Sequence, residues 1–212
     1  LAQAHDQEGT PEGDVFQAKA FELLARYGLS ESDVASDDTD MSEVVYKTVT
    51  ITGSYRKQQA TLLWAIATSL HCQVVLAPDN AVMHIFGANR HMERVMLLWS
   101  ILNPMMAAGA KRQRALAGSI YNTRQVRLSW MTGFSVQIRD RLAAAETMVA
   151  EETGTGTEIM LRDDAARALG ERDKMFPKLR KGTGTTIRSR EHFEAGREAA
   201  NGADLGQTRM AS

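Results

Sequence analysis

Two apolar runs joined by a four-residue turn sequence constrain this fold more than any other feature. The runs are "CQVVLA" at residues 72–77 and "VMHIFG" at residues 82–87, and "PDNA" at residues 78–81 joins them. Pro-Asp-Asn is strong turn chemistry, and β-branched and aromatic residues favour strands. The sequence therefore predicts an antiparallel hairpin that turns at Pro78–Ala81.

A further strand and a helix precede this hairpin. The segment "VVYKTVTI" at residues 44–51 alternates Val45, Val49 and Ile51 on one side, which predicts a half-buried strand. Residues 54–71 then take helical spacing through four apolar positions, Leu62, Leu63, Ile66 and Leu70.

Two more helices are expected after the hairpin. One begins near Asn89, with a stripe of Met92, Val95, Met96 and Trp99, and Pro104 is expected to break or kink it before residues 105–118 resume helical character. A long helix from Asn122 towards Ala150 has one face made of Val126, Trp130, Phe134, Ile138 and Leu142. Gly133 inside that helix costs about 1 kcal/mol against alanine, which indicates close packing at that point.

The first helix is predicted at residues 14–27. Its apolar positions Phe16, Ala20, Leu23, Leu24 and Tyr27 share one face, Asp14 and Gln17 have capping-box spacing, and Gly28 suits a C-cap. That face either covers the protein's own core or is a groove-binding surface for a partner, and we favour the core.

The C-terminal region is organised by two "GTGT" stretches at residues 154–157 and 182–185. We interpret them as flexible joints around a charged helical segment, so that residues 157–190 project from the body or pack on it loosely. The predicted fold is α+β: a small antiparallel sheet of about three strands packed with helices, followed by a loosely attached helical C-terminal arm. The predicted divisions are 1–40 (N-terminal helical element), 41–150 (α+β core) and 151–212 (C-terminal arm). Within this fold we expect four aromatic side chains to be mostly buried: Trp64, Trp99, Trp130 and Phe134.

Composition and charge restrict the class of protein. The chain has 212 residues, 43% hydrophobic, with a net charge of -1, which is ordinary for a soluble protein, and no stretch is long and apolar enough to span a membrane. A single cysteine, Cys72, excludes an internal disulfide and a multi-cysteine zinc site and fits a reducing, cytoplasmic setting. Because the chain begins at Leu1, we expect its natural start to lie upstream.

The near-zero net charge hides a sharp change of sign along the chain. Residues 1–50 carry 3 basic and 11 acidic side chains, a difference of -8, whereas residues 51–150 carry 11 basic and 4 acidic ones, a difference of +7. One interpretation is that residues 51–150 form a basic surface for nucleic acid, which the acidic residues 1–50 screen. The other is that the two segments face one another or face water.

Catalytic and metal-binding motifs are weakly represented. The five histidines lack the spacing of a helical zinc protease, and neither "GTGT" supplies the lysine of a phosphate-binding loop. We therefore predict no catalytic residue, no metal site and no cofactor. The alternative is a metal-dependent hydrolase with a site around His71, His84 and His91, in which His84 and His91 meet across the strand-to-helix turn.

The run "KMFPKLRKGTGTTIRSR" at residues 174–190 is the main candidate for partner binding. It holds six basic residues and no acid around a Gly/Thr joint, so it is either an adaptable binding segment or a solvated charged face. The apolar side chains beside the charges would supply the desolvated anchor that charges alone lack. The predicted contact residues are Met175, Phe176, Lys178, Leu179, Arg180, Lys181, Arg188 and Arg190.

Several stretches resemble a family of uncharacterised proteins common in actinobacteria and their phages. They are "AKAFELLARYGL", "CQVVLAPDNAVMHIFGANRHMERV", "RLSWMTGFSVQIRDRL" and "EAGREAANGADLG", and the first matches an N-terminal A-x-E-L-L-x-K-Y-G-L helix of that family. Within it, the opening at residues 1–28 is most similar to the recombination directionality factors of Streptomyces phages, which partner large serine integrases.

The resemblance implies a non-catalytic accessory protein. Such a factor binds its serine integrase and switches it from integration to prophage excision, touching DNA only through the integrase complex. A DNA-binding regulator that uses residues 174–190 is a third possibility, beside the hydrolase.

Overall fold

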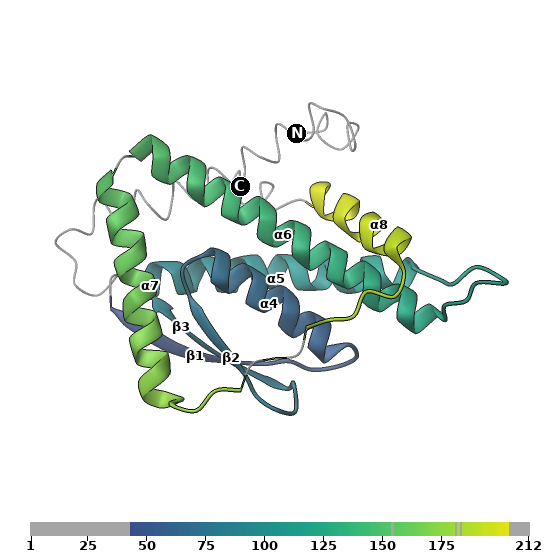
Figure 1. The fold of residues 1–212 in the computed structure, drawn as a ribbon, viewed down its shortest axis with the longest axis horizontal. Coiled ribbons are helices and arrows are strands. Elements are labelled where there is room, and N and C mark those ends of the chain that lie inside the picture. The colour runs from purple at the N-terminus through teal and green to yellow at the C-terminus, as the bar shows by residue number, and fades with distance from the viewer. Residues whose placement is uncertain (1–42, 154, 181, 183, 204–212) are drawn as a thin grey trace.

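The computed structural model describes residues 43–153, 155–180, 182 and 184–203, so the predicted helix at 14–27 lies outside the described residues. The described chain is an α+β fold, as predicted, with a three-stranded sheet and five helices (Figure 1). The strands are β1 (Val44–Thr50), β2 (Gln73–Leu76) and β3 (Val82–Ala88). The helices are α4 (Arg56–Ser69), α5 (Asn89–Arg112), α6 (Thr123–Thr153), α7 (Thr155–Met175) and α8 (Arg190–Asn201).

The sheet is antiparallel with the order β1-β3-β2, and it confirms both the predicted strand and the predicted hairpin. Val74 lies opposite Ile85 across the hairpin, and the amide of Ala77 donates to the carbonyl of Val82 at 2.9 Å. In the turn, the Asp79 carboxylate accepts from the Ala81 amide at 3.0 Å, and Asn80 takes a positive φ of 56°. The turn therefore uses the local side-chain chemistry that the Pro-Asp-Asn sequence indicates.

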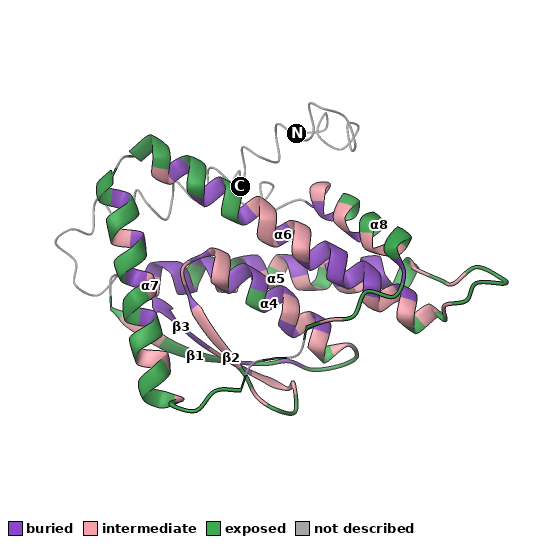
Figure 2. Ribbon diagram, viewed as in Figure 1, coloured by how far each residue is buried: buried purple, intermediate pink, exposed green. Residues whose placement is uncertain are grey.

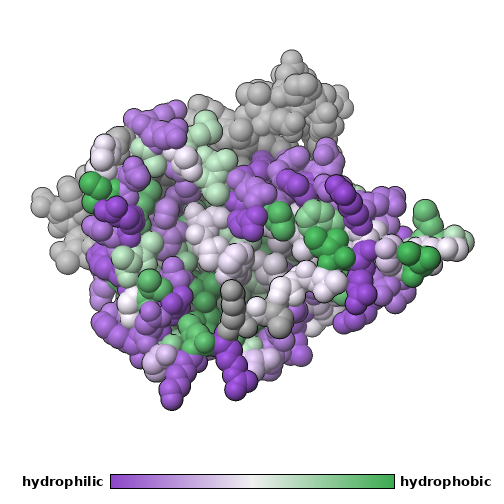
Figure 3. Space-filling view, in the orientation of Figure 1, coloured by the Kyte–Doolittle hydropathy of each residue, from purple (hydrophilic) through white to green (hydrophobic). Residues whose placement is uncertain are grey.

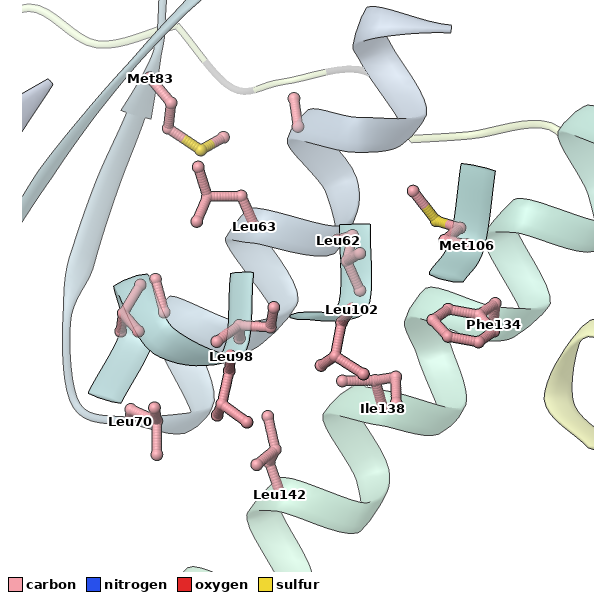
Figure 4. Close-up of a cluster of buried hydrophobic side chains, with 14 of the residues drawn as sticks. Leu62, Leu63, Leu70, Met83, Leu98, Leu102, Met106, Phe134, Ile138 and Leu142 are labelled. Carbon is pink, nitrogen blue, oxygen red and sulfur yellow. The ribbon is translucent and has the colours of Figure 1, made fainter. Parts of the chain in front are cut away.

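One face of the sheet is covered by the main hydrophobic core, to which α4, α5 and α6 contribute (Figure 4). Met83 and Ile85 of β3 point into it. The predicted apolar faces of α4 and α6 are buried there, as Figure 2 shows along the inner side of α6. The largest fully buried side chains are Leu62, Leu63, Ile66, Leu70, Met83, Ile85, Phe86, Met92, Leu98, Leu102 and Phe134. Each such side chain contributes about 1.5–3 kcal/mol relative to exposure, so this core is the main source of stability.

The prediction for the four aromatic residues is confirmed for Trp130 and Phe134, which are buried and stack at 5.5 Å between ring centroids. Trp99 is half-buried against the core. The prediction is wrong for Trp64, which is 43% exposed. Trp64 lies on the outward stripe of α4 with Thr61 and Thr68, because the core-facing positions of that helix lie on its other sides.

Of the two effects predicted at Pro104, the break is wrong, because α5 runs through that residue to Arg112, and the kink stays a prediction. Proline cannot donate to the carbonyl four residues back, so Ser100 loses its helical partner. Both Ser100 and Pro104 lie on the exposed side of α5, where water can satisfy that carbonyl. The helix then ends before residues 113–122, which form a loop rather than the expected continuation of the helix.

The C-terminal region is bound to the body more tightly than predicted. Helix α7 begins at Thr155, so residues 155–157 of the first "GTGT" stretch are the start of a helix and not a flexible joint. Four residues at helical spacing on α7 are buried, Thr157, Leu161, Asp164 and Ala168, and α7 lies against all three strands. The segment 157–175 is therefore a structural layer.

Helix α8 packs closely along α6, and two glycines make this possible. A Cβ atom on Gly133 would lie 1.9 Å from the Phe193 carbonyl oxygen, and one on Gly196 would lie 2.0 Å from that of Trp130. Neither distance is compatible with a side chain, because the obstacle is backbone. The close packing predicted at Gly133 is thus confirmed, and its partner is α8.

No helix within the described ranges has the length and apolar character needed to cross a bilayer.

Candidate functional site

Six ionisable side chains form a buried charge cluster where α5, α6 and α7 meet the turn after α4. We use this name for His71, Arg90, His91, Arg94, Glu146 and Asp164. The first turns of α5 supply Arg90, His91 and Arg94, so that residues 90 and 94 lie one helical turn apart. The two carboxylates come from α6 and α7, which places one acid on each neighbouring helix.

Asp164 is the centre of one half of the cluster. Its side chain is fully buried, and its Oδ2 accepts from His91 Nε2 at 2.9 Å and from the Arg90 guanidinium. The half-exposed Arg167 donates to the other oxygen. The carboxylate thereby joins α7 to the start of α5.

Glu146 is the centre of the other half. It pairs with the buried Arg94 guanidinium, and its Oε2 lies 3.3 Å from Nε2 of His71. His71 adopts a left-handed φ of 60° after α4, which brings its ring centroid to 5.4 Å from that of His91. The two halves of the cluster are therefore in contact through the two imidazoles.

Burial and hydrogen bonding fix the protonation states of the cluster. Burial opposes ionisation of Glu146, but the His71 ring 3.3 Å from its carboxylate and the charge of Arg94 outweigh it and lower the pKa of Glu146 to about 2. The pKa of Asp164 is also lowered, because its contacts with His91 and Arg90 outweigh burial. Burial lowers the pKa of His91 to about 4, so at neutral pH the ring is neutral and donates from Nε2 to Asp164.

These protonation states suit a structural tie between helices better than they suit a catalytic acid or base. A general acid must hold a proton near neutral pH, and both carboxylates are ionised well below it. The nearby Cys72 thiol is kept protonated, since burial raises its pKa to about 12. The physical role that fits the cluster is to hold α6 and α7 in a fixed position on α5.

The cluster is not fully satisfied within the described part of the chain. The atoms of the cluster that make no hydrogen bond there are His71 Nε2, Arg90 Nε, His91 Nδ1, Arg94 Nε and Nη1, and Glu146 Oε2. Unsatisfied buried polar atoms are costly, so such a cluster specifies one docking geometry for the helices more than it adds net stability.

The three histidines of the hydrolase alternative do not share one site. His71 and His91 are together, but His84 lies on the far face of β3, where its Nδ1 is 2.7 Å from the Tyr46 hydroxyl. His84 contacts Phe176 at the end of α7, twelve positions from Asp164, which corresponds to roughly 18 Å along a helix. The meeting of His84 and His91 that the hydrolase alternative requires is therefore not found. Among the residues that the structure describes, no group of three or more His, Cys, Asp or Glu is arranged to hold a metal ion.

Most of the predicted partner-binding residues lie on a strap, which we define as residues 176–189 between α7 and α8. Met175 and Arg190 flank it as the last residue of α7 and the first residue of α8. Its first residue, Phe176, packs on the sheet, with ring centroids 4.9 Å from His84 and 6.1 Å from Phe86. This residue is engaged by the protein itself instead of being free to anchor a partner. The remaining predicted residues that the structure describes, Met175, Lys178, Leu179, Arg180, Arg188 and Arg190, are all exposed, and Lys181 lies outside the described residues.

The far end of the strap is tied to α6. The amides of Arg188 and Ser189 each donate to Oγ of the buried Ser129 at 3.0 Å. Ser189 then caps α8, its hydroxyl accepting from the His192 amide at 3.4 Å. The strap is thus held at both ends, with an exposed basic middle.

Sequence reasoning missed most of the buried charge cluster and the Ser129 tie. One signal was present: Arg90 and Arg94 are charged residues beside Met92 and Val95, which belong to the predicted apolar stripe of that helix. Charges on a core-facing surface are seldom buried without partners. The positions of those partners, 146 and 164, follow only from the fold.

A family model described as "Protein of unknown function (DUF2786)" matches residues 1–31. The match supports the expected likeness to an uncharacterised domain family, and it covers the A-x-E-L-L-like helix. It lies outside the residues that the structure describes. No curated protein and no solved structure matches the chain.

Proposed function

We propose that this chain is a non-catalytic accessory protein that binds a phage large serine integrase and switches it from integration to excision. The observation that carries the proposal is the strap. It offers an exposed, basic and partly apolar segment on a body that holds both of its ends, which is a geometry suited to recognition by another macromolecule.

The charge of the strap favours an acidic contact surface. From Lys174 to Arg190 the sequence has six basic residues and no acid. Exposed apolar side chains, Met175, Leu179 and Ile187, stand among these charges. Charge sets the association rate and the specificity of an interface, while desolvated apolar contacts contribute most of its affinity.

The identity of the partner comes from the sequence resemblance to recombination directionality factors. In that class of system the integrase serine cuts and joins DNA, and the accessory protein supplies no chemistry. A coiled coil projecting from the integrase's zinc-containing DNA-binding domain holds subunits together across a synapse. A protein docked near the base of that coil changes which synapse is populated, and a coupling of about 1–3 kcal/mol is enough to shift such an equilibrium severalfold or more.

The test is a charge reversal on the strap with a matched control. The strap variant is Lys178→Glu/Arg180→Glu/Arg188→Glu, and the control reverses three exposed cations elsewhere, Lys47, Arg56 and Arg162. Both variants change the net charge equally. Binding to the purified integrase of the same phage or prophage is measured across a salt series, alongside excision of a plasmid substrate.

We expect the strap variant to bind more weakly than the control, with a difference that shrinks as salt is raised. We also expect it to lose excision. Normal binding and excision by the strap variant would show that the strap is a solvated face. Failure of the unmodified protein to bind the integrase would remove the proposed function itself.

A further inference from the structure

A projecting loop between α5 and α6 presents the most exposed large apolar side chains of the described chain. We call residues 113–122 the finger; it extends beyond the helices at the right of Figure 1, and its end is hydrophobic in Figure 3. Leu116 is 75% exposed and Ile120 86% exposed. Two exposed aliphatic side chains four positions apart on a projecting loop offer apolar surface that the described body does not cover.

The tip of the finger is a preformed turn. The Ser119 amide donates to the Leu116 carbonyl at 3.1 Å, and Gly118 has a φ of 80°, as the third position of a type II turn requires. The Ser119 hydroxyl accepts from the Tyr121 amide at 3.1 Å. Leu116 and Ile120 therefore flank a turn with a defined shape.

The base of the finger is also fixed. Arg127 on α6 donates to the carbonyls of Gln113 at 3.1 Å and Lys111 at 3.0 Å, which ties the end of α5 to the start of α6. Asn122 and Gln125 form a reciprocal capping box, with hydrogen bonds of 3.0 and 2.9 Å. A loop held in this way loses little conformational entropy when it binds, which favours affinity.

The surroundings of the finger are basic. The sequence contains no Asp or Glu between Glu93 and Asp140. Four exposed cations stand at the base and sides of the finger: Lys111, Arg112, Arg114 and Arg124. The surface that fits this element is an apolar pocket with carboxylates at its rim.

We propose that the finger inserts Leu116 and Ile120 into such an acid-rimmed apolar pocket on the integrase. This inference rests on the proposed function and adds a second contact to the strap. Affinity comes from the two aliphatic side chains, and the cations around them orient the approach.

The experiment compares two double variants of the full chain in binding to the purified integrase at physiological salt. Leu116→Ser/Ile120→Ser removes the apolar tip, and because both residues are exposed it leaves the core unchanged. The control, Leu97→Ser/Ile159→Ser, removes two exposed aliphatic side chains from the body of α5 and α7. Circular dichroism verifies that both variants fold.

We expect the tip variant to bind roughly 100-fold more weakly, mainly through faster dissociation, which corresponds to the loss of about 2.8 kcal/mol. The control is expected to stay within about twofold of the unmodified chain, the usual range for exposed substitutions. Reversing Arg112, Arg114 and Arg124 to glutamate should slow association and flatten its salt dependence.

Three results would overturn the inference. If the unmodified chain binds and the tip variant binds equally well, the finger is not a contact, while the proposed function stands. If neither binds, both the proposed function and this assignment of the finger fail. If the free chain instead binds duplex DNA and only the tip variant loses that binding, the finger contacts nucleic acid and not a protein pocket.

Discussion

Replacing Asp164 by asparagine tests whether the buried charge cluster holds α7 to the body. Asp164 is fully buried, and its carboxylate faces the Arg90 guanidinium, which is 3% exposed, and the buried His91. Asparagine keeps the shape and can still accept from His91 Nε2. What it removes is the negative charge that neutralises Arg90.

The expected loss is large because it leaves a buried charge without a partner. Removing one member of a buried ion pair costs about 3–5 kcal/mol in unfolding free energy. A typical domain has only about 5–15 kcal/mol in total, so the variant should lose a large fraction of its stability. Arg167 contacts the same carboxylate from the half-exposed side, where ion pairs contribute about 0–1 kcal/mol.

Urea unfolding at neutral pH, followed by tryptophan fluorescence, measures these differences. Arg167→Ala is the control and should lose no more than about 1 kcal/mol. The double variant Arg90→Met/Asp164→Leu removes both charges and should recover part of the loss, because buried pairs often exchange with apolar residues at little cost. Recovery should be incomplete, because His91 Nε2 then lacks its acceptor. A loss below about 1 kcal/mol for Asp164→Asn, or an equal loss for Arg167→Ala, would refute the reasoning.

Three further predictions concern other contacts. Gly196→Ala places a Cβ atom 2.0 Å from the Trp130 carbonyl oxygen, so α8 must move away from α6. We expect at least about 1–3 kcal/mol of destabilisation and faster hydrogen exchange in α8. Unchanged exchange would contradict this packing. Burial lowers the pKa of His91 from 6.5 to about 4, so the folded state resists a proton that the unfolded chain accepts. Stability should therefore be nearly complete above about pH 7.5 and fall by about 2 kcal/mol between about pH 7.5 and pH 5, and His91→Gln should lack this slope in urea titrations. Burial raises the pKa of Cys72 to about 12, and its Sγ lies 2.3 Å from where a Cβ on Gly87 would be. Iodoacetamide should therefore modify the Cys72 thiol only after unfolding. Rapid labelling of the native protein would disprove the burial of Cys72.

The features predicted correctly from the sequence are those with local causes. The hairpin depends on four turn residues and two adjacent apolar runs, so its strands pair within a few positions of their prediction. The buried face of α6 repeats over several turns, and a repeat of that length identifies a helix reliably. The close packing at Gly133 could be predicted because glycine destabilises a helix relative to alanine. A glycine at such a position is explained if a neighbouring segment leaves no room for a side chain.

The features predicted wrongly depend on contacts between distant segments. The first "GTGT" stretch has the composition of a linker, but the burial of Leu161 and Asp164 on the body makes residues 155–175 one helix. Asp164 and Arg90 are separated by 74 positions in the chain, and no local pattern connects them. Trp64 is the exception: it was expected on the buried helical stripe, but its position on α4 lies outside the face that carries Leu62, Leu63 and Ile66.

The buried charge cluster also determines where the strap lies, and this gives a functional prediction. Asp164 holds α7 on the body, and the same helix places Phe176 on the sheet, where the strap begins. The other end is tied to Ser129, so the backbone between the two ends has less freedom than that of a loose arm. A partner that binds the strap therefore has less backbone to order. Asp164→Asn should therefore weaken integrase binding at temperatures where the body is still folded, although Asp164 is too deeply buried to touch a partner. Arg90→Met/Asp164→Leu, in which α7 can dock again, should restore binding. Hydrogen exchange would show whether α7 is released in Asp164→Asn. If it is released and the variant still binds the integrase as tightly as the unmodified chain, the position of the strap does not matter for recognition.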